Sequence, residues 1–582
     1  MYNFAVKEEL LNIKNMKQTI LFSATLAAAL AVTTSCSKMG ALSSDNFSVT
    51  PQPLETVGGQ VPATINGKFP EKYFKKNAQV TVTPVLKYSN GEATSAPASF
   101  QGEKVVGNDQ TISYKVGGNY TMKANFKYVP EMQTSDLYLR FDAKKGKKKI
   151  NIPEVKIGYG VISTSELLGN TLASANPATA EDKYQREIKA TQEGRIKFLI
   201  NQANIRNNQL TSASIKDLKK KLKAINDSTE SRALDNVEVL AYASPEGPES
   251  FNDKLADKRG KVSENYMKKQ LKAHKLNGNV DMKYTAEDWD GFKELVSQSN
   301  MQDKELVLRV LSMYSDPQER ETQLRNMSSV FKSLATDILP ELRRSRLAVN
   351  YKIIGRSDQQ IQDQFKEDPS KLSNDEILYA ATLTDSPAEK KAIYQKTTEL
   401  YPNDYRAYNN LGKLAYESGD LATAESYYDK AASVDANAPE VNANKALDAL
   451  RKGDAAAAEQ FLGKATDSKT YNEVKGYLNT AKGDYAQAAQ DLNGVSSNGA
   501  ALAQILNKDY NGAANTLSNI KNADATTDYL KAIVAARTGN ESDVMSNLKS
   551  AISKDSSYAK RAAKDLEFAK YFTSAAFQSL TK

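Results

Sequence analysis

The stretch YNNLGKLAYESGDLATAESYYDKA, residues 408–431, decides how the C-terminal part of the chain folds. Small residues stand on both sides of its central Gly419-Asp420 turn and would let two antiparallel helices approach closely. The turn returns 34 residues later as Gly453-Asp454 and again as Gly483-Asp484, and weaker forms follow at Lys508-Asp509 and Gly539-Asn540. Stacked hairpins bury each apolar face on the next, so we predict an all-α solenoid over residues 374–582.

The first unit resembles the tetratricopeptide repeat at Tyr408, Leu411, Gly412, Ala415, Gly419, Ala424, Tyr428 and Ala431. The second unit keeps Ala446, Ala449, Gly453, Ala458, Leu462 and Ala465, whereas the later units are shorter and degenerate. The resemblance implies a concave groove that binds an unidentified envelope protein. The alternative is a scaffold that only extends or dimerises the molecule.

Residues 180–356 alternate between strand-like and helix-like stretches. Strands are predicted at 195–199, 237–243 and 346–353, and amphipathic helices at 212–225 and from 251 onward. This order predicts an α+β domain with a helical insertion at 290–342, followed by a linker over 357–373.

The strand at 237–243 leads into a loop and then a helix start that carries Asn252, Leu255 and Arg259. This order is similar to the OmpA-like, peptidoglycan-associated domain, in which an Asp and an Arg clasp the diaminopimelate of the wall stem peptide. The resemblance implies four peptidoglycan-binding residues, Ser244, Glu246, Asn252 and Arg259. Arg259 would hold a carboxylate bidentately.

One position departs from the OmpA-like pattern, because Ser244 stands where that family has an Asp. Glu246, in the same loop, would then supply the carboxylate that pairs with the ligand's ammonium group. Losing a charge-assisted hydrogen bond without replacement would weaken binding by about ten- to a hundredfold. The alternative is that the fold is kept while the site serves a structural or protein-binding role.

Residues 45–160 show the alternation of apolar and polar side chains that is typical of strands. It appears at 79–86 and 111–116, and the Gly117-Gly118-Asn119 turn joins the second run to another at 120–126. We predict an antiparallel, immunoglobulin-like β-sandwich that acts as a spacer or a docking surface.

The N-terminus has the features of an export signal. A basic start at Lys17 precedes an apolar run that is too short to span a bilayer, and small residues stand directly before Cys36. We predict a signal peptide over 1–35 with Met16 as the true start, lipidation of Cys36 and a lipidated linker over 36–44. The alternative is an ordinary secretory signal with an incidental Cys.

The residues after Cys36, Ser37 to Gly40, lack the acidic cluster that resembles the surface-export signal of Bacteroidota lipoproteins. The sequence therefore predicts a protein anchored by lipid in the outer membrane and facing the periplasm.

Composition excludes several kinds of chemistry. One Cys and one His allow no intrachain disulfide and no Cys/His metal site, so neither a metal nor a cofactor is expected. The net charge of +8 is spread thinly, and the basic run 144–149 reads as a polar hairpin tip rather than a nucleic-acid surface. The acidic run 287–290 lacks convergent carboxylates, so Trp289 reads as a core or interface anchor.

Together these features predict a non-enzymatic outer-membrane lipoprotein that acts as an envelope adaptor. It would link the membrane to peptidoglycan through the OmpA-like domain and recruit a protein partner through the repeats. The alternative is an accessory scaffold subunit of an outer-membrane protein assembly or secretion complex, without peptidoglycan binding. A wall-modifying enzyme is disfavoured because no nucleophile and base are paired in the sequence.

Overall fold

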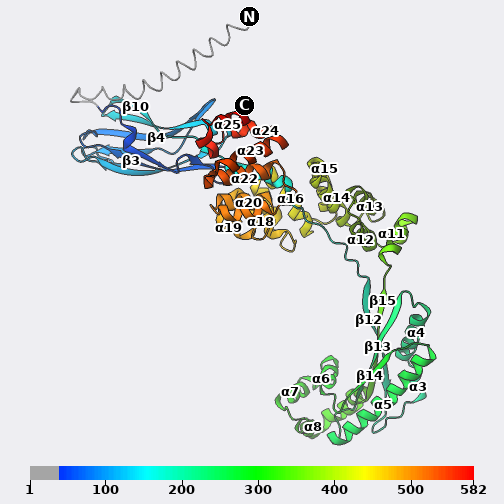
Figure 1. Cartoon of the computed structure of the whole chain (residues 1–582). Coiled ribbons are helices and arrows are strands. Elements are labelled where there is room, and N and C mark those ends of the chain that lie inside the picture. Colours follow the sequence, from blue (N-terminus) through cyan, green and yellow to red (C-terminus); the bar gives the residue numbers. More distant parts are fainter. Residues whose placement is uncertain (1–38) are drawn as a thin grey trace. The chain divides into compact units, whose positions relative to one another are not determined.

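The computed structural model describes residues 39–582, which divide into two compact units (Figure 1). The first unit combines the chain up to Ala180 with Asn403–Lys582, and the second unit is Glu181–Pro402. Cys36 and the predicted signal peptide lie outside the described residues. Among residues 39–582, no helix is both long enough and apolar enough to cross a membrane.

The first unit begins with two sheets that share one hydrophobic core. One sheet has the order β1-β3-β8, formed by Phe47–Thr50, Gln60–Phe69 and Gly118–Lys127. The other has the order β10-β9-β4-β6-β7, formed by Lys148–Tyr159, Ser135–Lys145, Ala78–Tyr88, Ala98–Gly102 and Gln110–Ile112, with β5 (Gly91–Thr94) paired to β4.

Alternating burial explains why these segments form a sandwich. In β8 every second residue is buried, which places one face of the strand on the core. The aromatic rings of Phe69, Phe100 and Tyr120 meet there, with centroids 4.5–5.3 Å apart. Gly67 leaves room for this cluster, because a Cβ at that position would lie 2.3 Å from the Tyr120 ring.

The C-terminal part of the first unit is a stack of helical hairpins (Figure 1). The helices are α14 (Tyr405–Glu417), α15 (Leu421–Val434), α16 (Pro439–Arg451), α17 (Ala455–Leu462), α18 (Tyr471–Lys482), α19 (Tyr485–Asp491), α20 (Asn498–Leu506), α21 (Tyr510–Ser518), α22 (Ala525–Thr538), α23 (Glu541–Lys554), α24 (Ser557–Ala562) and α25 (Ala575–Thr581).

The recurring Gly-Asp pair ends one helix and begins the next. Gly419, Gly453 and Gly483 have φ values of 82°, 79° and 84°, the left-handed conformation that closes a helix and favours glycine. The side chain of the following Asp then accepts a hydrogen bond from the first turn of the next helix, as Asp420 does from Thr423. The repeat found in the sequence is therefore a repeat of helix ends.

The second unit is built around a sheet with the order β12-β15-β13-β14, formed by Glu187–Lys197, Arg344–Ile354, Arg232–Tyr242 and Asn279–Thr285. β13 and β14 are parallel, and the other pairs are antiparallel. Helices α4 (Ala213–Asp227) and α5 (Glu249–Ala273) contribute Leu218 and Met267 to the core that the sheet shares.

Helices α6 (Trp289–Gln298), α7 (Lys304–Met313), α8 (Pro317–Asn326), α9 (Ser328–Ser333) and α10 (Leu339–Leu342) lie between β14 and β15 and have a core of their own. They occupy the region where the sequence predicts a helical insertion.

The predicted linker over 357–373 is wrong in part, because residues 358–367 form helix α11. Its N-terminus carries a capping box between Ser357 and Gln360, a local signal that the sequence already contains. Helices α11, α12 (Asn374–Ala380) and α13 (Pro387–Leu400) belong to the second unit, so the helical stack of the first unit starts after residue 403 rather than at 374.

Candidate functional site

One side of the solenoid is covered by the chain's own residues 161–180, the connecting segment. This segment runs through β11 (Val161–Ile162), η3 (Thr164–Leu167), α2 (Leu168–Thr171) and η4 (Leu172–Ser174) and then continues in extended form. Its helix α2 contacts α16, α18 and α20, the first helices of successive hairpins. We call the side of the solenoid formed by α14, α16, α18 and α20 the first-helix face.

Asparagine side chains on the first-helix face hold the main chain of the connecting segment. Asn410 accepts a hydrogen bond from the Ala180 N–H and donates one to its carbonyl, both at 2.9 Å. Asn444 makes the same pair with Ala178, at 2.6 and 2.9 Å, and Asn409 donates a further bond to the Ala178 carbonyl at 3.0 Å. All three asparagines are buried, so this face binds an extended chain through its peptide groups.

Apolar side chains of the connecting segment complete the contact. Leu167 and Leu172 are fully buried and belong to the same core as the solenoid helices. Tyr416 donates a hydrogen bond to the Leu172 carbonyl at 2.6 Å, and Lys413 donates one to the Pro177 carbonyl at 2.7 Å. The segment is thus part of the solenoid's core, and a partner protein could reach this face only after the segment had left it.

We expect Asn410→Ala to loosen the end of the connecting segment. Both main-chain groups of Ala180 would lose their partner in a buried setting, which costs about 2 kcal/mol. Hydrogen exchange at the Ala180 amide should then be faster by more than tenfold, since a factor of ten corresponds to about 1.4 kcal/mol. Asn437→Ala, at an exposed turn, is the matched control and should leave that rate unchanged. Equal exchange rates in the two variants would show that Asn410 does not hold Ala180 in place.

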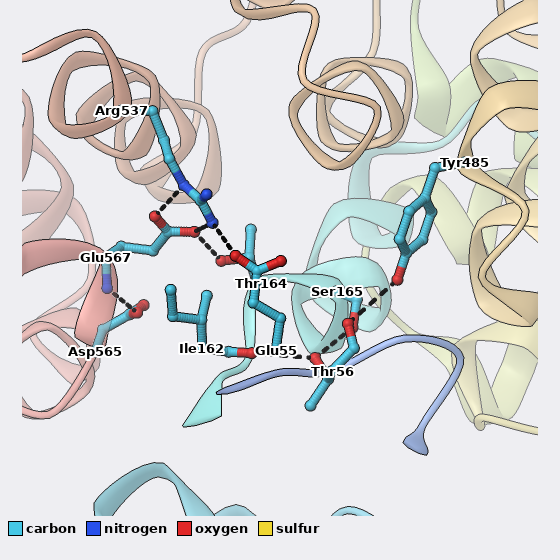
Figure 2. Close-up of polar contacts among 9 residues, drawn as sticks. All are labelled: Glu55, Thr56, Ile162, Thr164, Ser165, Tyr485, Arg537, Asp565 and Glu567. Atoms are coloured by element: carbon cyan, nitrogen blue, oxygen red, sulfur yellow. Dashed lines mark hydrogen bonds and ion pairs between the residues drawn. The ribbon is translucent and has the colours of Figure 1, made fainter. Parts of the chain in front are cut away.

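The sandwich, the connecting segment and the solenoid meet at one polar junction (Figure 2). β2 (Leu54–Glu55) pairs in parallel with β11, and the hydroxyls of Thr56 and Ser165 lie 2.6 Å apart. From the solenoid, Tyr485 donates a hydrogen bond to the Thr56 carbonyl at 3.4 Å. These contacts join the sandwich to the helical stack within the first unit.

A buried ion pair stands at the same junction. Arg537 lies 2.6 Å from Glu567 and 3.3 Å from Glu55, and Thr164 donates its hydroxyl hydrogen to Glu567 (Figure 2). Burial raises the pKa of Glu567, and the nearby Arg537 opposes that shift. No local sequence pattern predicts this group, because Glu55, Thr164 and Glu567 are far apart along the chain.

In the second unit, the residues that the OmpA-like resemblance selects lie close together. Ser244 donates a hydrogen bond to Glu246 at 2.8 Å, and Asn252 donates one to the Gly247 carbonyl at 3.3 Å. Glu321, from α8 of the insertion, accepts a hydrogen bond from the Gly247 N–H at 2.5 Å. The loop and the start of α5 therefore form one polar site, which the insertion contacts.

Arg259 is oriented into the protein and has no exposed surface. Its guanidinium donates to three carbonyl oxygens: those of Gln202 at 3.0 Å, Tyr242 at 2.9 Å and Leu199 at 3.1 Å. It also lies over the Phe198 ring, 5.2 Å from the centroid, and burial lowers its pKa to about 10. In this conformation the guanidinium binds the main chain of its own unit.

Glu246 forms an ion pair that no local sequence pattern predicts. Arg343, directly before β15, lies 2.6 Å from it, and both side chains are only 13% exposed. The adjacent Arg344 pairs with Asp288 at 2.8 Å. The signal for these pairs was the Arg343-Arg344 doublet at the end of the insertion, but its partners could be found only in the folded structure.

The acidic run 287–290 does not converge. Glu287 accepts hydrogen bonds from Asn252 and Trp289, whereas Asp288 caps α6 and pairs with Arg344. In residues 39–582, no three His, Cys, Asp or Glu side chains are placed to hold a metal ion.

Comparison with known proteins supports the assignment of tetratricopeptide repeats in the C-terminal region. Residues 393–426 match the tetratricopeptide repeat family model, and no curated protein matches the chain. One similar structure is a tetratricopeptide repeat protein from Parabacteroides merdae, with 13% identity and a TM-score of 0.27, covering 38% of this chain and 89% of that one.

Two further structures are similar at the same low level. The type IV pilus biogenesis factor PilW is 15% identical, with a TM-score of 0.24, over 39% of this chain and 96% of its own. Yeast Tom70 is 14% identical, with a TM-score of 0.22, over 62% and 78%. The family match at residues 393–426 and the stacked helical hairpins together make the C-terminal region a tetratricopeptide-like helical solenoid, preceded by a strand-rich N-terminal region.

Proposed function

We propose that the protein is a non-enzymatic adaptor of the bacterial envelope, held on the periplasmic face of the outer membrane by a lipid on Cys36. The observation that carries the proposal is the sandwich, connecting segment and solenoid folded as one unit, with the segment bound along the first-helix face. Such a unit is a single compact platform. Because the connecting segment covers the first-helix face, a protein partner would bind the second helices of the hairpins, such as α15 and α17.

Cross-linking tests this adaptor role. The mature chain would be cross-linked in intact cells, purified, and the cross-linked peptides mapped. We expect a reproducible protein partner joined to lysines on the second helices, such as Lys430 in α15. Cross-links confined to the sandwich or to the second unit, or no cross-linked protein at all, would contradict recruitment by the solenoid.

We also propose that the second unit binds peptidoglycan. Ser244, Glu246, Asn252 and Arg259 gather at one end of β13 and α5, and this proximity supports it. A stem-peptide carboxylate would have to replace a carbonyl on Arg259, and the ligand's ammonium group would have to compete with Arg343 for Glu246.

We expect Glu246→Gln to weaken co-sedimentation of the mature chain with purified sacculi by about ten- to a hundredfold. Glu246 is the better position to test, because it is 13% exposed and Gln keeps its shape, whereas Arg259 is fully buried on three carbonyl groups. Glu305→Gln, an exposed carboxylate on α7, is the matched control and should sediment like the wild type. Identical sedimentation of both variants would remove Glu246 from the wall site.

The alternative is an accessory scaffold subunit of an outer-membrane protein assembly or secretion complex that does not bind the wall. The occupied guanidinium of Arg259 favours it, since all three of its nitrogen atoms already donate to carbonyl groups. A chain that captures a protein partner but does not sediment with sacculi would select this alternative.

A further inference from the structure

Most of the chain's excess positive charge lies in four short connections of the sandwich. Residues 70–77, 103–109, 113–117 and 144–149 contain ten lysines and three acidic residues, a net charge of +7. The whole chain has a net charge of +8. The remainder of the chain is therefore close to neutral, because the protein's excess positive charge is concentrated in these four connections.

The fold brings these four connections to one end of the sandwich. Ala78, at the start of β4, pairs with Lys145 at the end of β9. The Lys104 N–H donates to the Lys76 carbonyl, and the Lys72 N–H to the Tyr114 carbonyl, both at 2.7 Å. We call the four connections together the basic end.

Most side chains of the basic end are accessible, although Phe74 is buried in the sandwich core. The five lysines within 144–149 are all exposed, and none forms an ion pair within residues 39–582, whereas Lys72 pairs with Glu71 at 3.7 Å and Lys76 with Glu103 at 3.8 Å. Two fully or largely exposed valines stand among the lysines: Val106 at 103% exposure and Val116 at 76%. Exposed valines beside lysines are a combination that suits the boundary between lipid headgroups and acyl chains.

The chain enters the sandwich at this same end. Met39 is buried in the sandwich core, and Tyr73, within the basic end, donates a hydrogen bond to the Gly40 carbonyl at 2.6 Å. Cys36 is three residues before Met39, a distance that an extended chain spans in at most about 10 Å. A lipid on Cys36 would therefore bring the basic end within roughly one Debye length, about 8–10 Å, of the headgroups.

We propose that the basic end is a second membrane contact, which docks on anionic phospholipid beside the lipid anchor. Its lysines would pair with lipid phosphates while Val106 and Val116 enter the interface. The inference rests on the lipid tether of the proposed function for its position in the cell, but the surface itself is a property of residues 70–149.

Docking in this way would set the distance of the solenoid from the bilayer. β3 runs from Gln60 to Phe69, about 30 Å at the usual rise per residue, and Phe69 lies at the basic end. Residues just before Gln60 contact the solenoid instead: a Cβ on Gly58 would lie 2.9 Å from the Lys482 carbonyl oxygen. The part of the solenoid around Lys482 would therefore stand up to about 30 Å from the membrane surface, in the space where a partner could reach it.

Vesicle binding by the unlipidated chain tests the proposal. The mature chain with Cys36→Ser would be mixed with vesicles of phosphatidylethanolamine and phosphatidylglycerol, and its partition measured by sedimentation. We expect binding that falls as salt is raised and that is absent with pure phosphatidylcholine. Lys145→Glu/Lys147→Glu/Lys148→Glu, at the tip of the β9–β10 hairpin, should bind roughly a hundredfold more weakly.

A matched control carries the same charge change elsewhere. Lys521, Lys549 and Lys560 are exposed on the solenoid, so Lys521→Glu/Lys549→Glu/Lys560→Glu should keep wild-type binding. Equal loss in both triple variants, or equal binding to phosphatidylcholine, would overturn the proposal. Tight binding to an oligonucleotide without binding to anionic vesicles would also overturn it. Because the test omits the lipid, a failure of Cys36 acylation would be seen separately, by fatty-acid labelling in cells.

Discussion

Replacing Arg259 with alanine is expected to lower the free energy of unfolding of the second unit by roughly 4 kcal/mol. The guanidinium satisfies three carbonyl oxygens in a place without solvent, and it covers the Phe198 ring. Alanine would leave those carbonyls without their charged donor and would open a cavity as well. Arg259→Lys keeps the charge but not the three-way geometry, so about half of the loss should remain.

The single tryptophan of the chain makes this measurement selective. Trp289 lies in α6 of the second unit, so its fluorescence during urea unfolding reports that unit. Arg309→Ala, at an exposed position on α7, is the control and should change stability by less than about 0.5 kcal/mol. If Arg259→Ala unfolded at the wild-type urea concentration, Arg259 would not be a structural residue. Its role would then have to be sought in a ligand.

Because Arg259 supports the fold of the second unit, wall binding by its variants cannot be interpreted without a measurement of stability. A loss of sacculus binding in an Arg259 variant would not by itself identify a ligand site, because the same side chain supports the loop and the strand around it. Binding and unfolding must be measured on the same variant. Glu246→Gln preserves the shape of the side chain but removes the charge that pairs with Arg343, so its unfolding must be measured as well.

Leu172→Ala should have the second large effect, a loss of about 2–5 kcal/mol in the first unit. Leu172 is fully buried in the core shared by the connecting segment and the solenoid, so the truncation would leave a cavity beneath the segment. The loosened segment should also become sensitive to proteases between residues 161 and 180.

Unfolding followed by far-ultraviolet circular dichroism measures this loss, together with a protease time course. Val434→Ala, on a side chain that is 37% exposed at the end of α15, is the matched control. Trp289 fluorescence should stay at the wild-type midpoint in Leu172→Ala, since the mutated residue lies in the other unit. A shift of the fluorescence midpoint alone would show that the connecting segment does not stabilise the solenoid.

Local sequence patterns predict many of the helices and strands. Gly419-Asp420 and its recurrences predict helix ends, because a left-handed residue and an N-cap act within a few residues of the chain. The alternation in 79–86 and 120–126 likewise predicts strands, and it lies in β4 and β8. The hairpin tip expected at 144–149 comprises the end of β9, a two-residue turn at 146–147 and the start of β10.

The residues predicted for the site in the second unit lie close together, but most of their contacts could not be predicted. The loop after β13 and the start of α5 lie together, because strand, loop and helix follow one another directly in the chain. The partners of these side chains could not be predicted from the sequence, because they lie far away along the chain. Arg259 donates to carbonyl groups as far as 60 residues away, and Arg343, which pairs with Glu246, is 97 residues after it. Peptidoglycan binding at this site stays a prediction.

By itself, the sequence determined the elements whose causes are local: the periodicity of helices and strands, the helix ends and the concentration of lysines in a few connections. Only the tertiary structure decided what those elements touch. Ala180 binds Asn410 across 230 residues, and Ala178 binds Asn444 across 266. Main-chain groups such as these carry no sequence signal, because every residue has them, so their partners are chosen by packing alone.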